Sequence, residues 1–260
     1  MLCLSDSRRD DDPWLQRLFN AVVETQTLTE LLMAVWPLSR MLPLHLVAKE
    51  MEMQEHVTFE VGEITLEGLL WIPSHPPSLG VVLCHPHPLY GGNMFNNVIT
   101  ALAKALQQAD IATLRFHFRG VGQSGGTHGD GEAEVEDVQG AITYLLSRQA
   151  LSTVAVTGYS FGAMVGLRAG VGDVRVQALI GVALPLGRRD ASFLLTAQKP
   201  TLLISGDRDS ISPLAALQEL VAQLPEPKQL HTIPGADHFF WGQEGEVAKT
   251  AVTFLESMHK

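Results

Sequence analysis

The chain has 260 residues, of which 46% are hydrophobic and 18% are charged, a composition typical of a folded globular protein rather than a disordered one. Its formal net charge of −10 argues against nucleic-acid binding, because phosphate recognition needs clustered lysine and arginine. Only Cys3 and Cys84 are present, and Cys84 lies in an apolar run, so a disulfide scaffold is not expected.

The first fifty or so residues differ in pattern from the rest. Amphipathic stretches after Pro13 and from Thr27 onward predict two short helices, which must pack on the main domain, a partner subunit or a membrane surface. Neither has a basic polar face, which favours packing on protein, including a homo-oligomer formed through these helices. The chain start does not resemble a secretory signal, and residues 28–47 make a poor membrane span, so we expect a cytoplasmic protein.

From about residue 56 the pattern becomes regular. Apolar and polar residues alternate on both sides of Gly62, which predicts a β-hairpin. Short apolar runs then alternate with stretches of helical periodicity. The predicted strands cover 79–84, 111–118, 152–158, 176–184, 200–206 and 228–234, and the predicted helices cover 97–106, 135–145, 161–169, 213–224 and 246–258.

This alternation predicts an α/β fold, with a mostly parallel central sheet covered by helices on both faces and the hairpin at one edge. We expect residues 53–260 to form this domain and residues 1–52 to form a helical extension. Reactive side chains in such a sheet lie in the loops at the carboxyl ends of the strands. Those loops bring a serine, an aspartate pair and a histidine, which are Ser160, Asp207 with Asp209, and His238.

The segment "GYSFG", residues 158–162, fits the G-x-S-x-G pattern of a sharp strand-to-helix turn that exposes a serine hydroxyl. We expect a Cβ at Gly158 or Gly162 to collide with neighbouring backbone. Ser160 is then the candidate nucleophile and His238 the base, with an aspartate that orients the imidazole.

Turn chemistry separates the two aspartates. Asp207 follows Gly206 directly and can satisfy backbone N–H groups of the turn. Asp209 lies further along, ahead of Ser212 and Pro213, which we expect to be the helix cap and the first helical residue. We therefore predict Asp209 as the acid.

The oxyanion hole needs two backbone N–H donors. The first should be that of Phe161, directly after the nucleophile. In the segment "HPHP", residues 85–88, the prolines have no N–H group, so His87 is the expected second donor. The alternative, a metal bound by the two histidines of that segment, lacks a third ligand, so no metal is expected.

Other residues have weaker signals. Tyr90, Tyr159 and Phe239 are candidates for a substrate pocket, although each could serve packing instead. Arg115 and Arg119 are expected to tie loops together. The glutamates at 132, 134 and 136 should favour the start of the following helix and face solvent.

Together, "HPHPLYGGNMFNN", "RFHFRGVGQSGG", "GYSFGA", "SGDRDSISP" and "GADHFF" resemble the α/β-hydrolase superfamily, particularly small bacterial serine hydrolases with little or no cap that are related to dienelactone hydrolase. The resemblance runs from Val57 to the C-terminus and also implies His87 as oxyanion donor and Asp209 as acid. Dienelactone hydrolase has a cysteine nucleophile, so Ser160 departs from it.

The resulting hypothesis is a serine esterase that cleaves small-molecule carboxylic esters of short to medium acyl chain through an acyl-enzyme, without a cofactor. Two alternatives remain open. The same triad could cleave thioesters or activated amides, or the fold could serve as a non-catalytic binding module.

Overall fold

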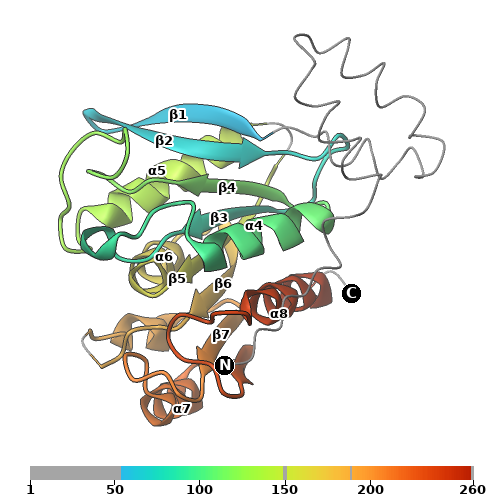
Figure 1. Ribbon diagram of the computed structural model, residues 1–260. Helices are drawn as coiled ribbons and strands as arrows, with labels where there is room; N and C mark the ends of the chain where they lie inside the picture. The colour runs from blue at the N-terminus through green and yellow to red at the C-terminus, as the bar shows by residue number, and fades with distance from the viewer. Residues whose placement is uncertain (1–53, 149–150, 188, 259–260) are drawn as a thin grey trace, which may run out of the picture. The chain divides into compact units, whose positions relative to one another are not determined.

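The computed structural model describes residues 54–148, 151–187 and 189–258. The chain opens with the hairpin β1 (Glu55–Val61) and β2 (Ile64–Trp71), and β3 (Gly80–Cys84), the 3-10 turn η1 (Pro88–Tyr90) and α4 (Asn97–Gln108) follow. Next come β4 (Ala112–Phe116), α5 (Glu134–Ser147), β5 (Val154–Tyr159), α6 (Phe161–Val171) and β6 (Val176–Val182). The last elements are η2 (Ser192–Thr196), β7 (Thr201–Gly206), α7 (Leu214–Gln223), β8 (Lys228–Ile233) and α8 (Glu244–Ser257) (Figure 1).

The eight strands form one sheet in the order β1-β2-β4-β3-β5-β6-β7-β8. The strands β4, β3, β5, β6, β7 and β8 each pair in parallel with their neighbours in this order. At one edge, β1 pairs antiparallel with β2, and β2 pairs antiparallel with β4. The predicted fold class is therefore confirmed, with the hairpin at the edge of a mostly parallel sheet.

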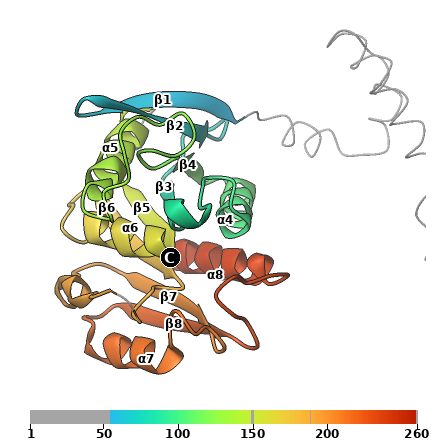
Figure 2. The ribbon, with the colours of Figure 1, turned by 60° about the vertical axis from the view of Figure 1, so that its left-hand side comes forward.

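Two apolar clusters lie on opposite faces of the sheet. One contains buried residues of α5, α6 and α7, and the other contains those of α4 and α8. Figure 2 shows α5 and α6 on one side of the strands and α4 and α8 on the other. Every residue of β3, β4, β5 and β7 is buried, as expected for strands covered on both faces.

The elements predicted from residue 56 onward all occur, with small shifts at their ends. The prediction that Pro213 is the first residue of its helix is wrong: α7 begins at Leu214, and Pro213 occupies the cap position without a side-chain hydrogen bond. Ser212 therefore does not occupy the cap position, and its N–H donates to Asp209.

Between β6 and β7 the described residues contain one short element, η2, and no helical domain above the sheet. No helix among the described residues has the length and apolar character needed to span a membrane. The predicted N-terminal helices and the domain boundary near residue 52 fall outside the described part of the chain.

Candidate active site

The turn between β5 and α6 holds Ser160 in an unusual backbone conformation. Its φ of 55° and ψ of −118° lie outside the regions that side-chain-bearing residues favour. The Ser160 N–H donates to the Val182 carbonyl at 2.8 Å, which ties the turn to the neighbouring strand. Strain of this kind persists only where surrounding structure fixes it.

The two glycines of the turn are needed for space, as predicted. A Cβ at Gly158 would lie 2.1 Å from the Gly162 carbonyl oxygen, and one at Gly162 would lie 2.1 Å from that of Cys84. Real Cβ atoms do not approach backbone so closely. The steric prediction for this turn is confirmed, and the serine is presented at the start of α6.

Three side chains from three loops converge at this turn. The Ser160 Oγ lies 2.9 Å from Nε2 of His238, which follows β8. The His238 Nδ1 lies 2.7 Å from Oδ2 of Asp209, which follows β7. Because an ionised carboxylate only accepts hydrogen bonds, the proton lies on Nδ1, and Nε2 is left to accept the serine proton.

The two aspartates of the β7 loop have different partners. Asp209 is buried, and its Oδ1 accepts hydrogen bonds from the Ile211 and Ser212 N–H groups, both at 2.8 Å. Burial on its own would raise the pKa of Asp209, but the hydrogen bonds from His238, Ser212 and Ile211 outweigh it and lower the pKa, so the carboxylate stays ionised. Asp207 instead accepts from the Gly235 N–H at 2.7 Å and does not contact His238.

The three pocket candidates lie in different environments. Tyr159 is only 3% exposed, and its hydroxyl donates to the His238 carbonyl at 2.6 Å. It therefore holds the His238 backbone in place, and a role in lining a substrate pocket stays a prediction. Tyr90 and Phe239 are exposed large aromatics in the loops after β3 and β8.

The loop after β3 is fixed by a buried histidine. His85 Nδ1 donates to the Pro86 carbonyl at 2.6 Å, and its Nε2 accepts from the Phe118 N–H at 3.1 Å. Burial lowers the pKa of His85 to about 3, so the ring is neutral. The Pro86 carbonyl and the His87 N–H belong to one peptide group, so His85 also fixes the direction of that N–H.

The N–H groups of Phe161 and His87 have no acceptor within the described residues. The His87 and Phe161 rings lie 4.8 Å apart between centroids, which places the two segments side by side. Phe161 also begins α6, whose amino end carries a positive partial charge. Two N–H groups without an acceptor next to the serine have the character of an oxyanion hole, because they can donate hydrogen bonds to a negatively charged oxygen.

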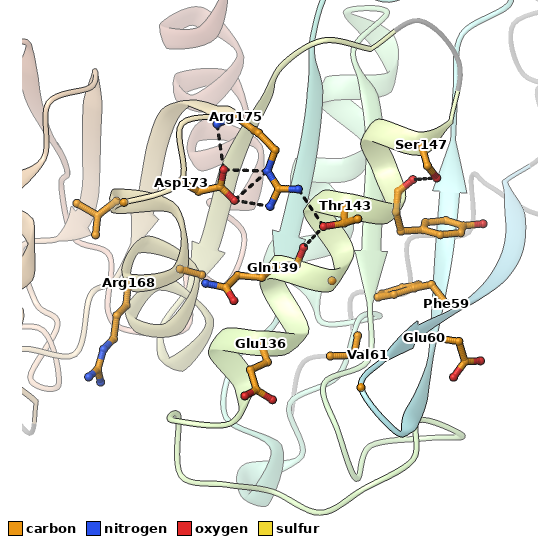
Figure 3. Close-up of a pocket in the computed structure, with 16 residues that line it drawn as sticks. Phe59, Glu60, Val61, Glu136, Gln139, Thr143, Ser147, Arg168, Asp173 and Arg175 are labelled. Atoms are coloured by element: carbon orange, nitrogen blue, oxygen red, sulfur yellow. Dashed lines mark hydrogen bonds and ion pairs between the residues drawn. The ribbon is translucent and has the colours of Figure 1, made fainter.

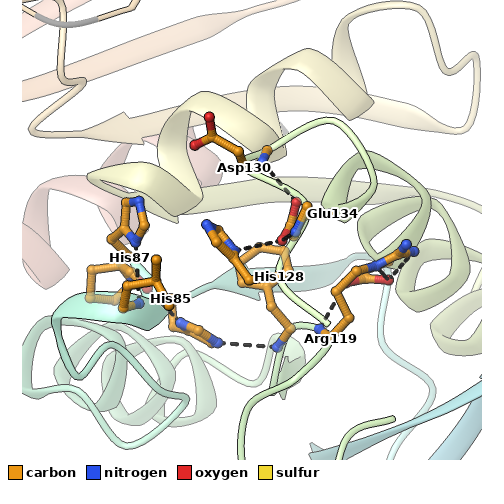
Figure 4. Close-up of polar contacts among 12 residues, drawn as sticks. His85, His87, Arg119, His128, Asp130 and Glu134 are labelled. Carbon is orange, nitrogen blue, oxygen red and sulfur yellow. Dashed lines mark hydrogen bonds and ion pairs between the residues drawn. The ribbon is translucent and has the colours of Figure 1, made fainter. Parts of the chain in front are cut away.

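A second group of polar residues lies beside the loop after β3 and was missed from the sequence; Figure 4 labels three of them, His128, Asp130 and Glu134, near His87. It comprises His128, Asp130, Glu134 and Arg189, and the Arg189 guanidinium lies 5.6 Å from the Phe161 ring centroid. The prediction that Glu134 faces solvent is wrong. Its side chain is fully buried, and its carboxylate accepts hydrogen bonds from two loop N–H groups. The spacing of these residues carries no periodic signal, so only the folded loops reveal the group.

The two arginines expected to tie loops do so. Arg119 forms an ion pair with the buried Asp137 at 2.7 Å. Arg115 donates to the Met94 carbonyl and to the Thr100 hydroxyl.

A groove of about 1060 Å³ lies elsewhere, between β1, α5 and α6 (Figure 3). None of Ser160, Asp209 and His238 lines it. Its most prominent cation, Arg175, is held by Asp173 at 2.6 Å and donates to the Thr143 hydroxyl. This cation is thus engaged within the groove, and Ser160, Asp209 and His238 lie instead at the carboxyl ends of the strands.

Comparisons with known proteins agree with the fold. A family model described as an alpha/beta hydrolase domain matches residues 80–258. An alpha-beta serine hydrolase homologue from Coxiella burnetii is 33% identical with a TM-score of 0.70, covering 76% of this chain and 96% of that one. A lidless serine hydrolase from Xanthomonas campestris is 29% identical with a TM-score of 0.72, covering 79% and 94%. A dienelactone hydrolase from Anabaena variabilis is 26% identical with a TM-score of 0.68, covering 79% and 97%.

Proposed function

The chain belongs to the alpha/beta hydrolase family, and from this premise we propose that it is a serine esterase that cleaves carboxylic esters of short to medium acyl chain. The observation that carries the proposal is the continuous chain of contacts from Ser160 Oγ through His238 to Asp209, at 2.9 and 2.7 Å. Such a relay supplies a nucleophile, a base and an orienting acid without a cofactor.

In the proposed reaction, Ser160 Oγ attacks the ester carbonyl carbon while His238 Nε2 takes the serine proton. The imidazolium then gives this proton to the leaving alcohol, and an acyl group remains on Ser160. Water, deprotonated by the same histidine, releases the carboxylic acid and restores the serine. Asp209 holds the imidazole tautomer and stabilises the positive ring.

The negative oxygen of the tetrahedral intermediate is stabilised by the N–H groups of Phe161 and His87. Both donors are fixed before substrate arrives, the first by the start of α6 and the second by His85 and the Pro86 carbonyl. Donors fixed in advance stabilise developing charge without the cost of reorganisation.

The preference for short chains follows from what covers the serine. Among the described residues of the connection from β6 to β7, the one helical element is the five-residue η2, and none of them forms a helical lid. The neighbouring hydrolase from Xanthomonas is itself described as lidless. An open site buries few methylene groups, and each contributes about 0.8 kcal/mol only when it is buried.

The proposal is tested by comparing the intact protein with Ser160→Ala on p-nitrophenyl butyrate. We expect the variant to lose activity by about 10⁴-fold or more. A fluorophosphonate probe should label the wild-type protein on Ser160 and leave the variant unlabelled. Absence of both hydrolysis and labelling in the folded wild-type protein would instead favour a binding module. A matched panel of esters, thioesters and amides of one acyl group tests the choice of bond.

A further inference from the structure

Beside the proposed catalytic residues, two loops bring together His87, His128 and Asp130 (Figure 4). One ligand atom from each of the three side chains lies within 4.8 Å of the other two. His87 belongs to the loop after β3, whereas His128 and Asp130 belong to the segment between β4 and α5. Two imidazoles and a carboxylate are a donor set typical of zinc and related metals.

His128 is held in the orientation of a metal ligand. Its Nδ1 lies 2.7 Å from Oε1 of Glu134, an ion-pair contact rather than an aligned hydrogen bond. Its Nε2 is buried and has no hydrogen-bond partner among the described residues. Leaving a buried polar atom unpaired costs about 1–3 kcal/mol, so this nitrogen needs a partner that the described chain does not supply.

Glu134 is suited to supporting such a ligand. Its carboxylate is fully buried and accepts hydrogen bonds from the Gly129 and Gly131 N–H groups at 2.7 and 2.8 Å. A carboxylate behind one ring nitrogen, with the other nitrogen left for the ion, is the usual support of a metal-binding histidine. In Figure 4 the His128 ring lies between the Glu134 side chain and the His87 side chain.

The other histidine of this loop cannot contribute, because both ring nitrogens of His85 are used within the protein. His87 has more freedom. Its side chain is partly buried and, among the described residues, accepts one hydrogen bond, from the Leu89 N–H to Nδ1, which is long at 3.3 Å.

We propose that His87, His128 and Asp130 form a binding site for a divalent transition-metal ion of the zinc class, and that the bound ion inhibits hydrolysis. Ligand atoms around a tetrahedral zinc lie about 3.3 Å apart, given bond lengths of about 2.0 Å. The three groups therefore close by up to about 1.5 Å, through the partly exposed His87 and the exposed Asp130, while His128 stays fixed.

Inhibition follows from where the ion would lie. The rings of His87 and His128 are 4.8 and 5.4 Å from that of Phe161, between centroids. His87 must move toward the ion by part of the distance over which the three groups close, and this movement displaces its peptide N–H, one of the two donors that stabilise the oxyanion in the proposed reaction. This second statement rests on the proposed function, whereas metal binding does not.

Arg189 is the natural competitor of the ion. It donates to the Asp130 carbonyl at 2.8 Å and pairs with its carboxylate at 2.5 Å, and this pairing lowers the pKa of Asp130. Metal binding must displace the guanidinium from the carboxylate. Removal of Arg189 should therefore strengthen metal binding, which no purely structural role for the cluster predicts.

The test is isothermal titration of Zn²⁺ into the chelator-treated full chain and its variants, with folding checked by circular dichroism. Glu134→Gln should weaken binding by about 10- to 100-fold, and His128→Ala should weaken it further. Arg189→Gln should bind more tightly, by up to about fivefold, the equilibrium worth of an exposed ion pair. The matched control is His231→Ala, because His231 also lies near a glutamate, at 3.6 Å from Glu246, but far along the chain from the cluster.

Wild-type binding that is lost in His128→Ala and kept in His231→Ala supports the site. Should Glu134→Gln fail to fold, the opposite effects of His128→Ala and Arg189→Gln still decide the matter. Equal Zn²⁺ affinity in wild type and His128→Ala would overturn the proposal. Binding at the site without slower p-nitrophenyl butyrate hydrolysis would overturn the inhibition alone.

Discussion

At the scale of single residues, two aspartates that lie two positions apart in the loop after β7 have different hydrogen-bond partners. Asp209 is buried and bonded to His238, whereas Asp207 closes the turn to Gly235. The proposed acid must keep the imidazole proton on Nδ1 of His238. An asparagine at position 209 can donate from its NH₂ group to Nδ1, which favours the tautomer with the proton on Nε2.

Asp209→Asn should therefore lower kcat by about 10⁴-fold, as in other triads. Asp207→Asn should act mainly on stability, with kcat close to wild type. The measurement is steady-state hydrolysis of p-nitrophenyl butyrate by both variants after their folding has been checked. A larger loss of kcat in Asp207→Asn would reverse the assignment.

His85 gives a prediction for the dependence of stability on pH. Its ordinary pKa of 6.5 is lowered by burial to about 3 in the folded protein. Between these values the unfolded chain binds a proton at His85 and the folded protein does not, so acidification favours unfolding. This residue should remove about 1.4 kcal/mol from the free energy of unfolding per pH unit as the pH falls from 6.5 toward 3.

The check is urea unfolding between pH 4 and 7 for wild type and His85→Gln, whose amide does not titrate in this range. As the pH falls, the free energy of unfolding of the wild type should decrease more steeply than that of His85→Gln, by about 1.4 kcal/mol per pH unit, the slope for one bound proton. Identical slopes for wild type and His85→Gln would show that His85 is protonated equally in both states.

Residue types and turn chemistry were enough to predict some features of the site but not others. The need for glycine at position 158 has a local cause, because the turn itself brings the Gly162 carbonyl close, whereas Gly162 is confined by the Cys84 and His85 carbonyl oxygens at the end of β3. The burial of Glu134 depends on the loop before α5, whose Gly129 and Gly131 N–H groups donate to its carboxylate. A pattern of first-turn acids predicts helix preference, but it does not show which carboxylate a loop will cover.

At the scale of elements, the close approach of α6 to the sheet determines how the serine is presented. Nine of the eleven residues of α6 are buried, and small residues allow this contact. Gly162 is the tightest position, with the Cys84 and His85 carbonyl oxygens 2.1 and 2.4 Å from where a Cβ would lie.

Gly162→Ala should accordingly destabilise the protein by about 3 kcal/mol or more, because backbone rather than flexible side chains must move. Gly172, at the end of the same helix, is the matched control. A Cβ there meets nothing within 4 Å, so Gly172→Ala should change the free energy of unfolding little. Denaturant unfolding of both variants measures the difference, and equal stabilities would contradict the packing described for α6.

Element order was predictable because strand and helix periodicities differ, and each strand and helix predicted within the described residues is present. The ends of the elements were less predictable. Pro213 has the residue type of a first helical position, yet α7 begins one residue later, at Leu214. The Asp209 carboxylate accepts the Ser212 N–H in the loop that leads into this helix, a contact that residue types alone do not reveal.

At the scale of the whole molecule, we expect the connections between strands to set the substrate range. If the site buried the acyl chain, each added methylene would raise kcat/KM by about fourfold, from about 0.8 kcal/mol each. An open site should instead give a kcat/KM that levels off or falls beyond medium chains. A series of p-nitrophenyl esters from butyrate to palmitate measures this, and a preference for palmitate over butyrate would require a covering segment.

The central claim is that Ser160 carries the acyl group during turnover, and rapid-quench mass spectrometry of the intact protein with p-nitrophenyl butyrate tests it most directly. The account predicts a transient mass increase equal to one butyryl group, located on the peptide containing Ser160 and absent from Ser160→Ala. Continued hydrolysis with no adduct on Ser160, or an adduct on another residue that persists in Ser160→Ala, would contradict it.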